Sequence, residues 1–136
     1  MSARSKARKR ALDVLYAAEM RGESPAEALD RAVAEGEGPT NPYTSELVRG
    51  VVEHRARIDE VLSSYARSWS LERMPAVDRN VLRLGVFEIL YVADVPDAVA
   101  VTEAINLVRD LSTDDSPSFV NGVLGTVVRD KAGIVD

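Results

Sequence analysis

Five basic residues near the N-terminus have the types and spacing most suited to chemistry in this sequence. They lie in the first ten positions, which hold no acidic residue: Arg4, Lys6, Arg8, Lys9 and Arg10. Cations gathered in one short segment commonly bind polyanions such as nucleic-acid phosphates. They also repel one another at this spacing, and cations at a helix N-terminus oppose the helix dipole. We therefore predict that residues 1–8 form a flexible basic arm, which becomes ordered against a polyanion.

The net charge of −5 hides an asymmetry between this arm and the rest of the chain. The 136 residues include 17 Lys and Arg against 22 Asp and Glu. Outside the first ten positions, 126 residues carry 12 basic and 22 acidic side chains, for a net charge of −10. The distribution suits a polyanion at the arm and a basic partner at the acidic body. On composition alone, the alternative is a solvated terminus that only aids solubility.

An aromatic residue in the first turn of the last predicted helix is the second candidate for binding. Phe119 follows the helix-start signal of residues 114–117 and stands close to Asn121 and Gly122. Unstacked bases of single-stranded RNA are commonly held on aromatic rings, which contribute about 1–3 kcal/mol per base. The alternative on spacing alone is that Phe119 belongs to the core, as Phe usually does in an amphipathic helix.

Catalytic and metal chemistry find little support in the sequence. The chain has no cysteine and a single histidine, His54, which excludes disulfide scaffolds, thiolate metal sites and His-rich metal centres. No run of spaced glycines suggests a phosphate-cradling loop, and the adjacent carboxylates Asp59 and Glu60 diverge on a helix. We therefore expect no enzyme, no metal and no cofactor, with His54 as a partly exposed helical residue.

Membrane and secretory classes are also unlike this sequence. The longest stretch without a charged residue, residues 116–128, has 13 residues and is too short to cross a bilayer. No apolar segment follows the basic N-terminus, as a secretory signal would require. We expect a cytoplasmic protein.

Helical periodicity runs through nearly the whole chain, so the predicted fold class is all-α with six or seven helices. Residues 98–102 alternate Ala and Val like a strand, but no second strand pattern exists to pair with them. The expected helices are an N-terminal one stopped by Gly22, one from Pro25 to near Gly36, one over residues 42–65 with a bend near His54, one over 77–92, one over 101–111, and one from Ser116. A boundary near Pro75 would divide the chain into half-domains of about 1–68 and 69–136.

Four segments, taken together and in order, resemble the NusB family of bacterial transcription antitermination factors. They are Ala7-Arg8-Lys9-Arg10-Ala11, Asp78-Arg79-Asn80-Val81-Leu82-Arg83-Leu84, Val101-Thr102-Glu103-Ala104-Ile105-Asn106-Leu107-Val108 and Phe119-Val120-Asn121-Gly122-Val123-Leu124. The last of these is the most specific, and the match covers essentially all of residues 1–136. The resemblance implies a single domain of two small helical bundles.

The resemblance also implies a function in binding RNA. NusB-like proteins bind boxA, a single-stranded element in the RNA of ribosomal operons, together with NusE, a small-subunit ribosomal protein, and so act indirectly on the RNA polymerase antitermination complex. The family's RNA-binding positions carry over to Arg4, Lys6, Arg8, Lys9, Arg10 and Phe119. Its partner-binding positions carry over to Tyr16, Asp78 and Glu72. Where relatives often have an aromatic before the last helix, this chain has Leu111, which weakens the expected base stacking.

Four alternatives stay open at this point. A helical protein-interaction adaptor would bind no RNA at all. A small helix-turn-helix protein would bind a nucleic-acid duplex as well as single-stranded RNA. The NusB-like domain of an RNA methyltransferase would need a methyl-donor domain, for which 136 residues leave no room. A homodimer that masks the RNA surface is the fourth.

Overall fold

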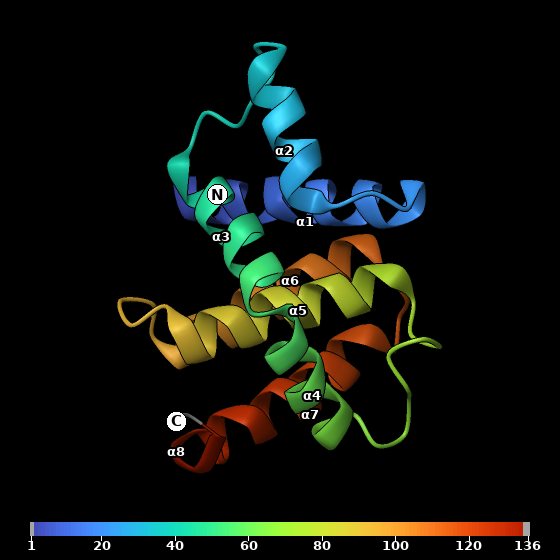
Figure 1. Ribbon diagram of the computed structural model, residues 1–136. Coiled ribbons are helices and arrows are strands. Elements are labelled where there is room, and N and C mark those ends of the chain that lie inside the picture. The colour runs from blue at the N-terminus through green and yellow to red at the C-terminus, as the bar shows by residue number, and fades with distance from the viewer. Residues whose placement is uncertain (1, 135–136) are drawn as a thin grey trace. The chain divides into compact units, whose positions relative to one another are not determined.

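Helices are the only regular secondary structure in residues 2–134, the part of the chain that the computed structural model describes (Figure 1). They are α1 (Ala3–Arg21), α2 (Pro25–Ala34), α3 (Pro42–Glu53), α4 (Arg55–Tyr65), α5 (Ala76–Tyr91), α6 (Asp97–Leu111), α7 (Ser116–Arg129) and α8 (Lys131–Ile134). The predicted all-α class is confirmed for the described residues. Their eight helices exceed the predicted six or seven, because residues 42–65 form two helices and α8 adds one further turn.

Local sequence signals account for several helix ends. Gly22 ends α1 in the left-handed conformation, at φ +68°, and its backbone N–H donates to the carbonyls of Ala18 and Glu19. Glycine reaches this conformation without a steric penalty, so the predicted stop is confirmed. Pro96 precedes α6, which already includes the strand-like residues 98–102 and begins earlier than predicted.

The predicted bend near His54 is a complete break between α3 and α4. The chain divides into two compact units at this point, the first ending at Glu53 and the second starting at His54. This division differs from the predicted one near residue 68, because α4 packs against α5 and α7 rather than continuing α3.

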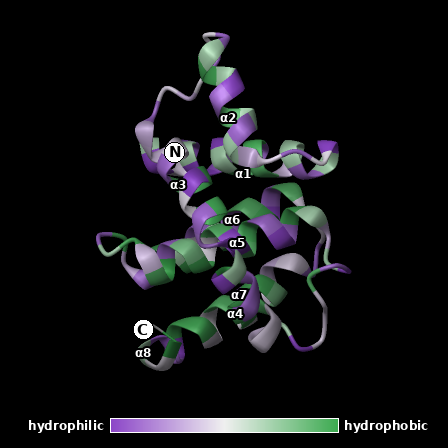
Figure 2. Ribbon diagram, in the orientation of Figure 1, coloured by the Kyte–Doolittle hydropathy of each residue, from purple (hydrophilic) through white to green (hydrophobic). Residues whose placement is uncertain are grey.

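The first unit is a packing of three helices, in which α1, α2 and α3 contact one another pairwise. Small and branched apolar residues recur on the buried face of α1, where Ala11 and Ala18 are fully buried. From α2 and α3, the buried residues include Leu29, Leu47 and Val48. The outer faces are charged, and Figure 2 shows hydrophilic residues along much of α1 and α2. The buried faces of the three helices form the core of this unit and hold α1, with its basic residues, in place.

The second unit is built around α5, which contacts α4, α6 and α7. Every residue of α5 from Asn80 to Ile89 is buried, as expected for a helix that is apolar on nearly every side. Helix α7 packs on α4, α5, α6 and α8, and Figure 2 shows it as largely hydrophobic. These contacts fix the start of α7, where Phe119 lies.

Candidate nucleic-acid interface

The first turns of α1 place the five N-terminal cations in different surroundings. Ser2 caps the helix, since its hydroxyl accepts a hydrogen bond from the Ser5 backbone N–H at 3.0 Å. Arg4 and Arg8, one turn apart, both lie over the ring of Tyr43, with guanidinium carbons 4.2 Å and 5.7 Å from its centroid. Such cation–π contacts favour the stacked position over a fully solvated one. Tyr43 was not among the predicted site residues, and no sequence signal linked it to α1.

Arg8 is only 4% exposed, which sets it apart from the other predicted phosphate contacts. A buried guanidinium cannot reach the RNA backbone without leaving its place in the fold. Its spacing from Arg4 puts it on the buried side of α1, next to Ala7 and Ala11. Composition alone does not tell which side of a basic helix faces the protein, and the role of Arg8 in RNA binding stays a prediction.

Lys6, Lys9 and Arg10 are exposed, and two of them flank a groove. The groove has a volume of about 450 Å³ and is lined by Ala3, Lys6, Ala7 and Arg10 of α1, by Gly38, Pro39, Thr40 and Asn41 of the α2–α3 connection, and by Thr44 of α3. Arg10 also donates to the carbonyl of Glu37 at 3.3 Å. We refer to this groove, with the lining residues given above, as the basic groove.

The side of the basic groove that comes from the α2–α3 connection and α3 is joined to α1 by side-chain hydrogen bonds. The Asn41 amide donates to the Ala3 carbonyl at 3.3 Å, and the Thr44 hydroxyl donates to the Ala7 carbonyl at 3.1 Å. Asn41 also accepts a bond from the Tyr43 backbone N–H at 2.9 Å, which caps α3. Residues 3–8 form the first turns of α1 in this structure, whereas the sequence predicted a flexible arm. Their flexibility in the free protein stays a prediction, which amide hydrogen exchange tests.

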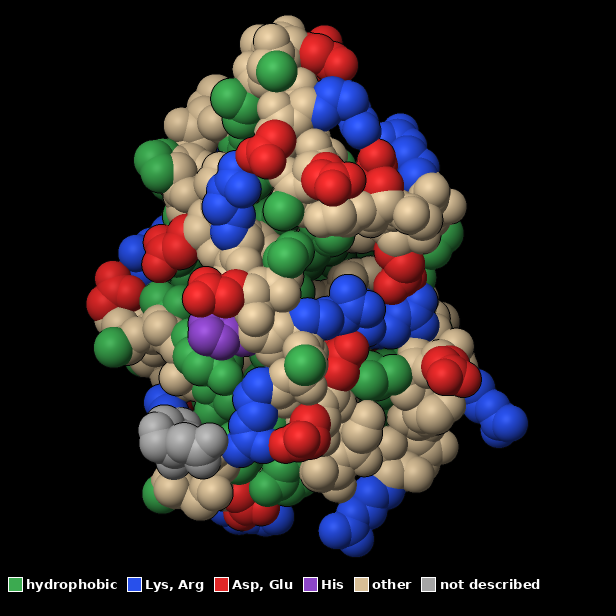
Figure 3. Space-filling model, in the orientation of Figure 1, with side chains coloured by type: hydrophobic (Ala, Val, Ile, Leu, Met, Phe, Trp, Pro, Cys, Tyr) green, Lys and Arg blue, Asp and Glu red, His purple; other side chains and the backbone are tan. Residues whose placement is uncertain are grey.

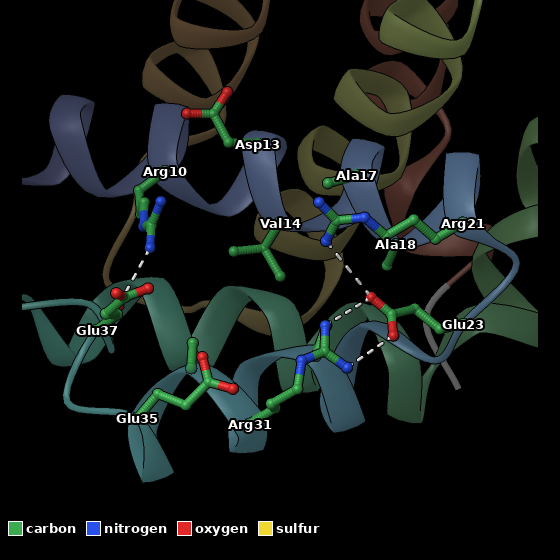
Figure 4. Close-up of a pocket in the computed structure, with 12 residues that line it drawn as sticks. Arg10, Asp13, Val14, Ala17, Ala18, Arg21, Glu23, Arg31, Glu35 and Glu37 are labelled. Atoms are coloured by element: carbon green, nitrogen blue, oxygen red, sulfur yellow. Dashed lines mark hydrogen bonds and ion pairs between the residues drawn. The ribbon is translucent and has the colours of Figure 1, made fainter.

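A second groove, between α1 and α2, has its charges neutralised internally (Figure 4). Arg31 forms two hydrogen bonds of 2.9 Å to the Glu23 carboxylate, and Arg21 lies 3.8 Å from the same group. The Arg31 guanidinium lowers the pKa of the Glu23 carboxyl below its ordinary value. With Arg21 and Arg31 held by one carboxylate in this way, this groove is a poor candidate for binding phosphate.

Phe119 lies in the first turn of α7 and is half-buried. Its ring meets the ring of Trp69 edge-on, with centroids 5.3 Å apart and planes at 75°. Trp69 was not predicted as a site residue. The signal that could have found it is a lone tryptophan between Arg67 and Arg73, in a segment without helical periodicity.

The three predicted partner-binding residues are unequal in exposure. Tyr16 on α1 is 39% exposed, and Glu72 is exposed in the α4–α5 connection. Asp78 is completely buried, and its Oδ1 accepts a hydrogen bond from the Ser112 hydroxyl at 2.5 Å. A buried carboxyl offers a partner no surface in this conformation, and the role of Asp78 in partner binding stays a prediction. Asp78 instead links the start of α5 to the end of α6.

His54 lies against two aromatic side chains of α5. Its ring stacks on Tyr91, with centroids 3.9 Å apart and planes at 14°, and lies 6.2 Å from Phe87. Within residues 2–134, no group of three or more His, Cys, Asp or Glu side chains is placed to hold a metal ion. None of the described helices is long and apolar enough to cross a membrane.

One face of the molecule carries side chains of both charges. On the face that Figure 3 shows, basic and acidic side chains lie interspersed. The fold and this surface define the protein as an all-helical one with two compact units and a local basic edge on the first helix.

Comparison with known proteins gives the family. The model of the NusB family matches residues 5–129. A transcription antitermination protein NusB of a Nocardioides species is 73% identical over 134 residues, covering 98% of this chain and 99% of that protein. One from Kineococcus radiotolerans is 55% identical over 127 residues, covering 93% of each. The chain belongs to the NusB family, as its sequence motifs predicted.

Solved structures agree in fold. A T. maritima NusB structure has a TM-score of 0.84 at 32% identity, covering 95% of this chain and 92% of that one. A structure of the antitermination factors NusB and NusE in complex with dsRNA has a TM-score of 0.79 at 31% identity, covering 93% of this chain and 96% of that one.

Proposed function

We propose that this protein is a transcription antitermination factor of the bacterial cytoplasm that binds boxA RNA of ribosomal operons together with NusE. It works by recognition rather than by catalysis. The observation that carries the proposal is the basic groove, where Lys6 and Arg10 stand at the rim of a space of about 450 Å³. Family membership and the related complex of NusB, NusE and dsRNA support it.

The proposed role of each residue follows from the chemistry of its side chain. Lys6, Lys9 and Arg10 contact phosphates, and Arg4 joins them if it leaves the Tyr43 ring. Phosphate contacts fix position, whereas the aromatic surface at Phe119 selects among bases. Tyr16 and Glu72 belong to the surface for NusE, a ribosomal protein that is expected to be basic and so to suit the acidic body of this chain.

The deciding experiment is a titration with labelled boxA RNA, a scrambled control and a boxA duplex, each with and without NusE. We expect boxA to bind more tightly than the scrambled RNA, and NusE to increase the difference. Equal binding of the scrambled RNA would reduce the protein to a non-specific polyanion binder. No RNA binding under any condition would favour the helical adaptor instead.

The salt dependence of RNA binding tests which cations meet phosphates. Each contact to a single strand contributes about 0.7 to the slope of log K against log[salt]. Changing Lys6 and Arg10 together to Gln is therefore expected to flatten the slope by about 1.4. Arg8→Gln should leave the slope unchanged, because Arg8 is buried over Tyr43. The control is Arg49→Gln, an exposed residue that pairs with Asp30 on the same unit. An unchanged slope in the Lys6 and Arg10 variant would place the contacts elsewhere.

The partner surface is tested separately from the RNA surface. Tyr16→Ala and Glu72→Lys are each expected to weaken NusE binding about tenfold, the size of a moderate interface hot spot, and to leave RNA binding without NusE unchanged. Glu46→Lys makes the same charge change at an exposed position of α3 and should have no effect on either ligand. Parallel loss of NusE and RNA binding would indicate a folding defect and contradict the assignment.

A further inference from the structure

The segment between α4 and α5, residues 66–75, presents an aromatic ring that the proposed function leaves unused. Trp69 is the only tryptophan of the chain. It is half-buried, and so is Phe119, whose ring it meets at 5.3 Å in an edge-to-face arrangement. This geometry is a favoured one for aromatic pairs, so each ring holds the other in a defined orientation.

The backbone that carries Trp69 is held in place from α5. The Arg79 guanidinium donates to the carbonyl of Leu71 at 2.8 Å and to that of Met74 at 3.1 Å. Backbone bonds from Arg73 and Met74 to the Ser70 carbonyl close a turn directly after Trp69. The ring is therefore positioned before any ligand arrives, which lowers the entropy lost on binding.

Two exposed cations in this segment give a nucleic acid phosphate contacts beside the aromatic pair. Arg67 and Arg73 are exposed on either side of Trp69 in the segment. Aromatic rings between cations are the usual arrangement for single-stranded nucleic acid, in which bases stack and phosphates are neutralised. Asp114 and Asp115, before α7, repel phosphate, so the backbone of the ligand is expected on the side of Arg67 and Arg73.

We infer that Trp69 and Phe119 together form a two-ring surface that stacks RNA bases, with Arg67 and Arg73 beside the adjacent phosphates. The inference rests on the proposed function and extends it to a residue that the family resemblance did not supply. Trp69 would then provide the second aromatic that is missing at Leu111. Because Trp69 is the only tryptophan, the tryptophan fluorescence of the protein reports directly on this site.

The first test is fluorescence of the full-length protein during titration with boxA RNA. Stacking of a base on Trp69 is expected to quench its emission and to protect it from acrylamide, a neutral quencher. Scrambled RNA at the same concentration should do neither. Binding is followed in parallel by anisotropy of labelled RNA, which reports complex formation whether or not Trp69 takes part.

The second test compares variants at Trp69. Trp69→Leu is expected to weaken boxA binding at least about fivefold, whereas Trp69→Phe should stay within about twofold of the parent because it keeps a stacking face. Tyr91→Leu is the control, since Tyr91 is an exposed aromatic of the same unit that stacks on His54. Circular dichroism checks that each variant is folded. If Trp69→Leu does not fold, acrylamide protection of Trp69 in the parent decides the matter.

The outcomes separate this inference from the proposed function. If boxA binds the parent specifically while Trp69 stays unprotected and Trp69→Leu binds normally, the inference is overturned and the function stands. If Trp69→Leu weakens NusE binding but not RNA binding, the pair is a protein contact, and the inference is again overturned. If the parent does not distinguish boxA from scrambled RNA by anisotropy, it is the proposed function that fails.

Discussion

Replacing Asp59 by Ala is expected to lower the free energy of unfolding by about 3 kcal/mol, the lower end of the usual cost of removing one partner of a buried ion pair, because the Asp59 side chain is 25% exposed. The side chain of Arg83 on α5 is only 5% exposed. Its Nε and Nη2 donate to the two oxygens of Asp59 on α4 at 2.9 Å and 3.1 Å. Without Asp59, a positive charge inside the second unit loses a carboxylate that holds it by two hydrogen bonds, and α4 loses a polar link to α5.

Urea denaturation followed by circular dichroism measures the effect of Asp59→Ala. The matched control is Arg55→Ala, which removes the other, exposed cation that contacts the same carboxylate at 2.9 Å. Exposed ion pairs contribute about 1 kcal/mol or less, so this variant should remain close to the parent. Equal destabilisation by both substitutions would mean that the burial of Arg83 is not what makes the pair important.

Replacing Gly85 by Val is expected to destabilise the protein by about 2–3 kcal/mol through overpacking. A Cβ at this position on α5 would lie 2.7 Å from Cδ1 and 3.2 Å from Cδ2 of Leu124 on α7. Leu124 is itself fully buried, so its side chain would have to change its packing inside the core to make room. The close approach of the two helices depends on the absence of a side chain at Gly85.

The comparison for Gly85 is Gly125→Ala on α7, where an added Cβ meets no atom within 4 Å. That substitution is expected to stabilise the protein by up to about 1 kcal/mol through helix propensity. Combining Gly85→Val with Leu124→Ala should recover part of the stability lost in Gly85→Val, because the two residues share one space. A Gly85→Val protein as stable as the parent would contradict the overpacking argument.

Periodicity and helix-end signals predicted most of the fold because these properties are local. Gly22 stops α1 through its own φ angle, and the bend at His54 follows from a helical pattern too long to continue straight. The single turn of α8 and the division of the chain at His54 were not predicted, because both depend on which helices pack together. Helix α4 belongs with α5 and α7, although the sequence pattern joined it to α3.

The candidate site was only partly predictable for the same reason. Residue types pointed to Lys6, Lys9 and Arg10, and these are exposed. The burial of Arg8 arises from tertiary contacts on one side of α1, and that of Asp78 from packing at the start of α5. The pairing of Trp69 with Phe119 joins residues that no local pattern relates.

The hydrogen bonds from Asn41 and Thr44 to carbonyls of α1 have a consequence for cooperativity. The rim of the basic groove comes from the start of the chain, and its opposite wall comes from the α2–α3 connection. Opening of that connection by local unfolding would release the first turns of α1 at the same time. A mutation in the connection, remote from any phosphate, would then reduce the fraction of molecules that are competent to bind and weaken apparent affinity in proportion.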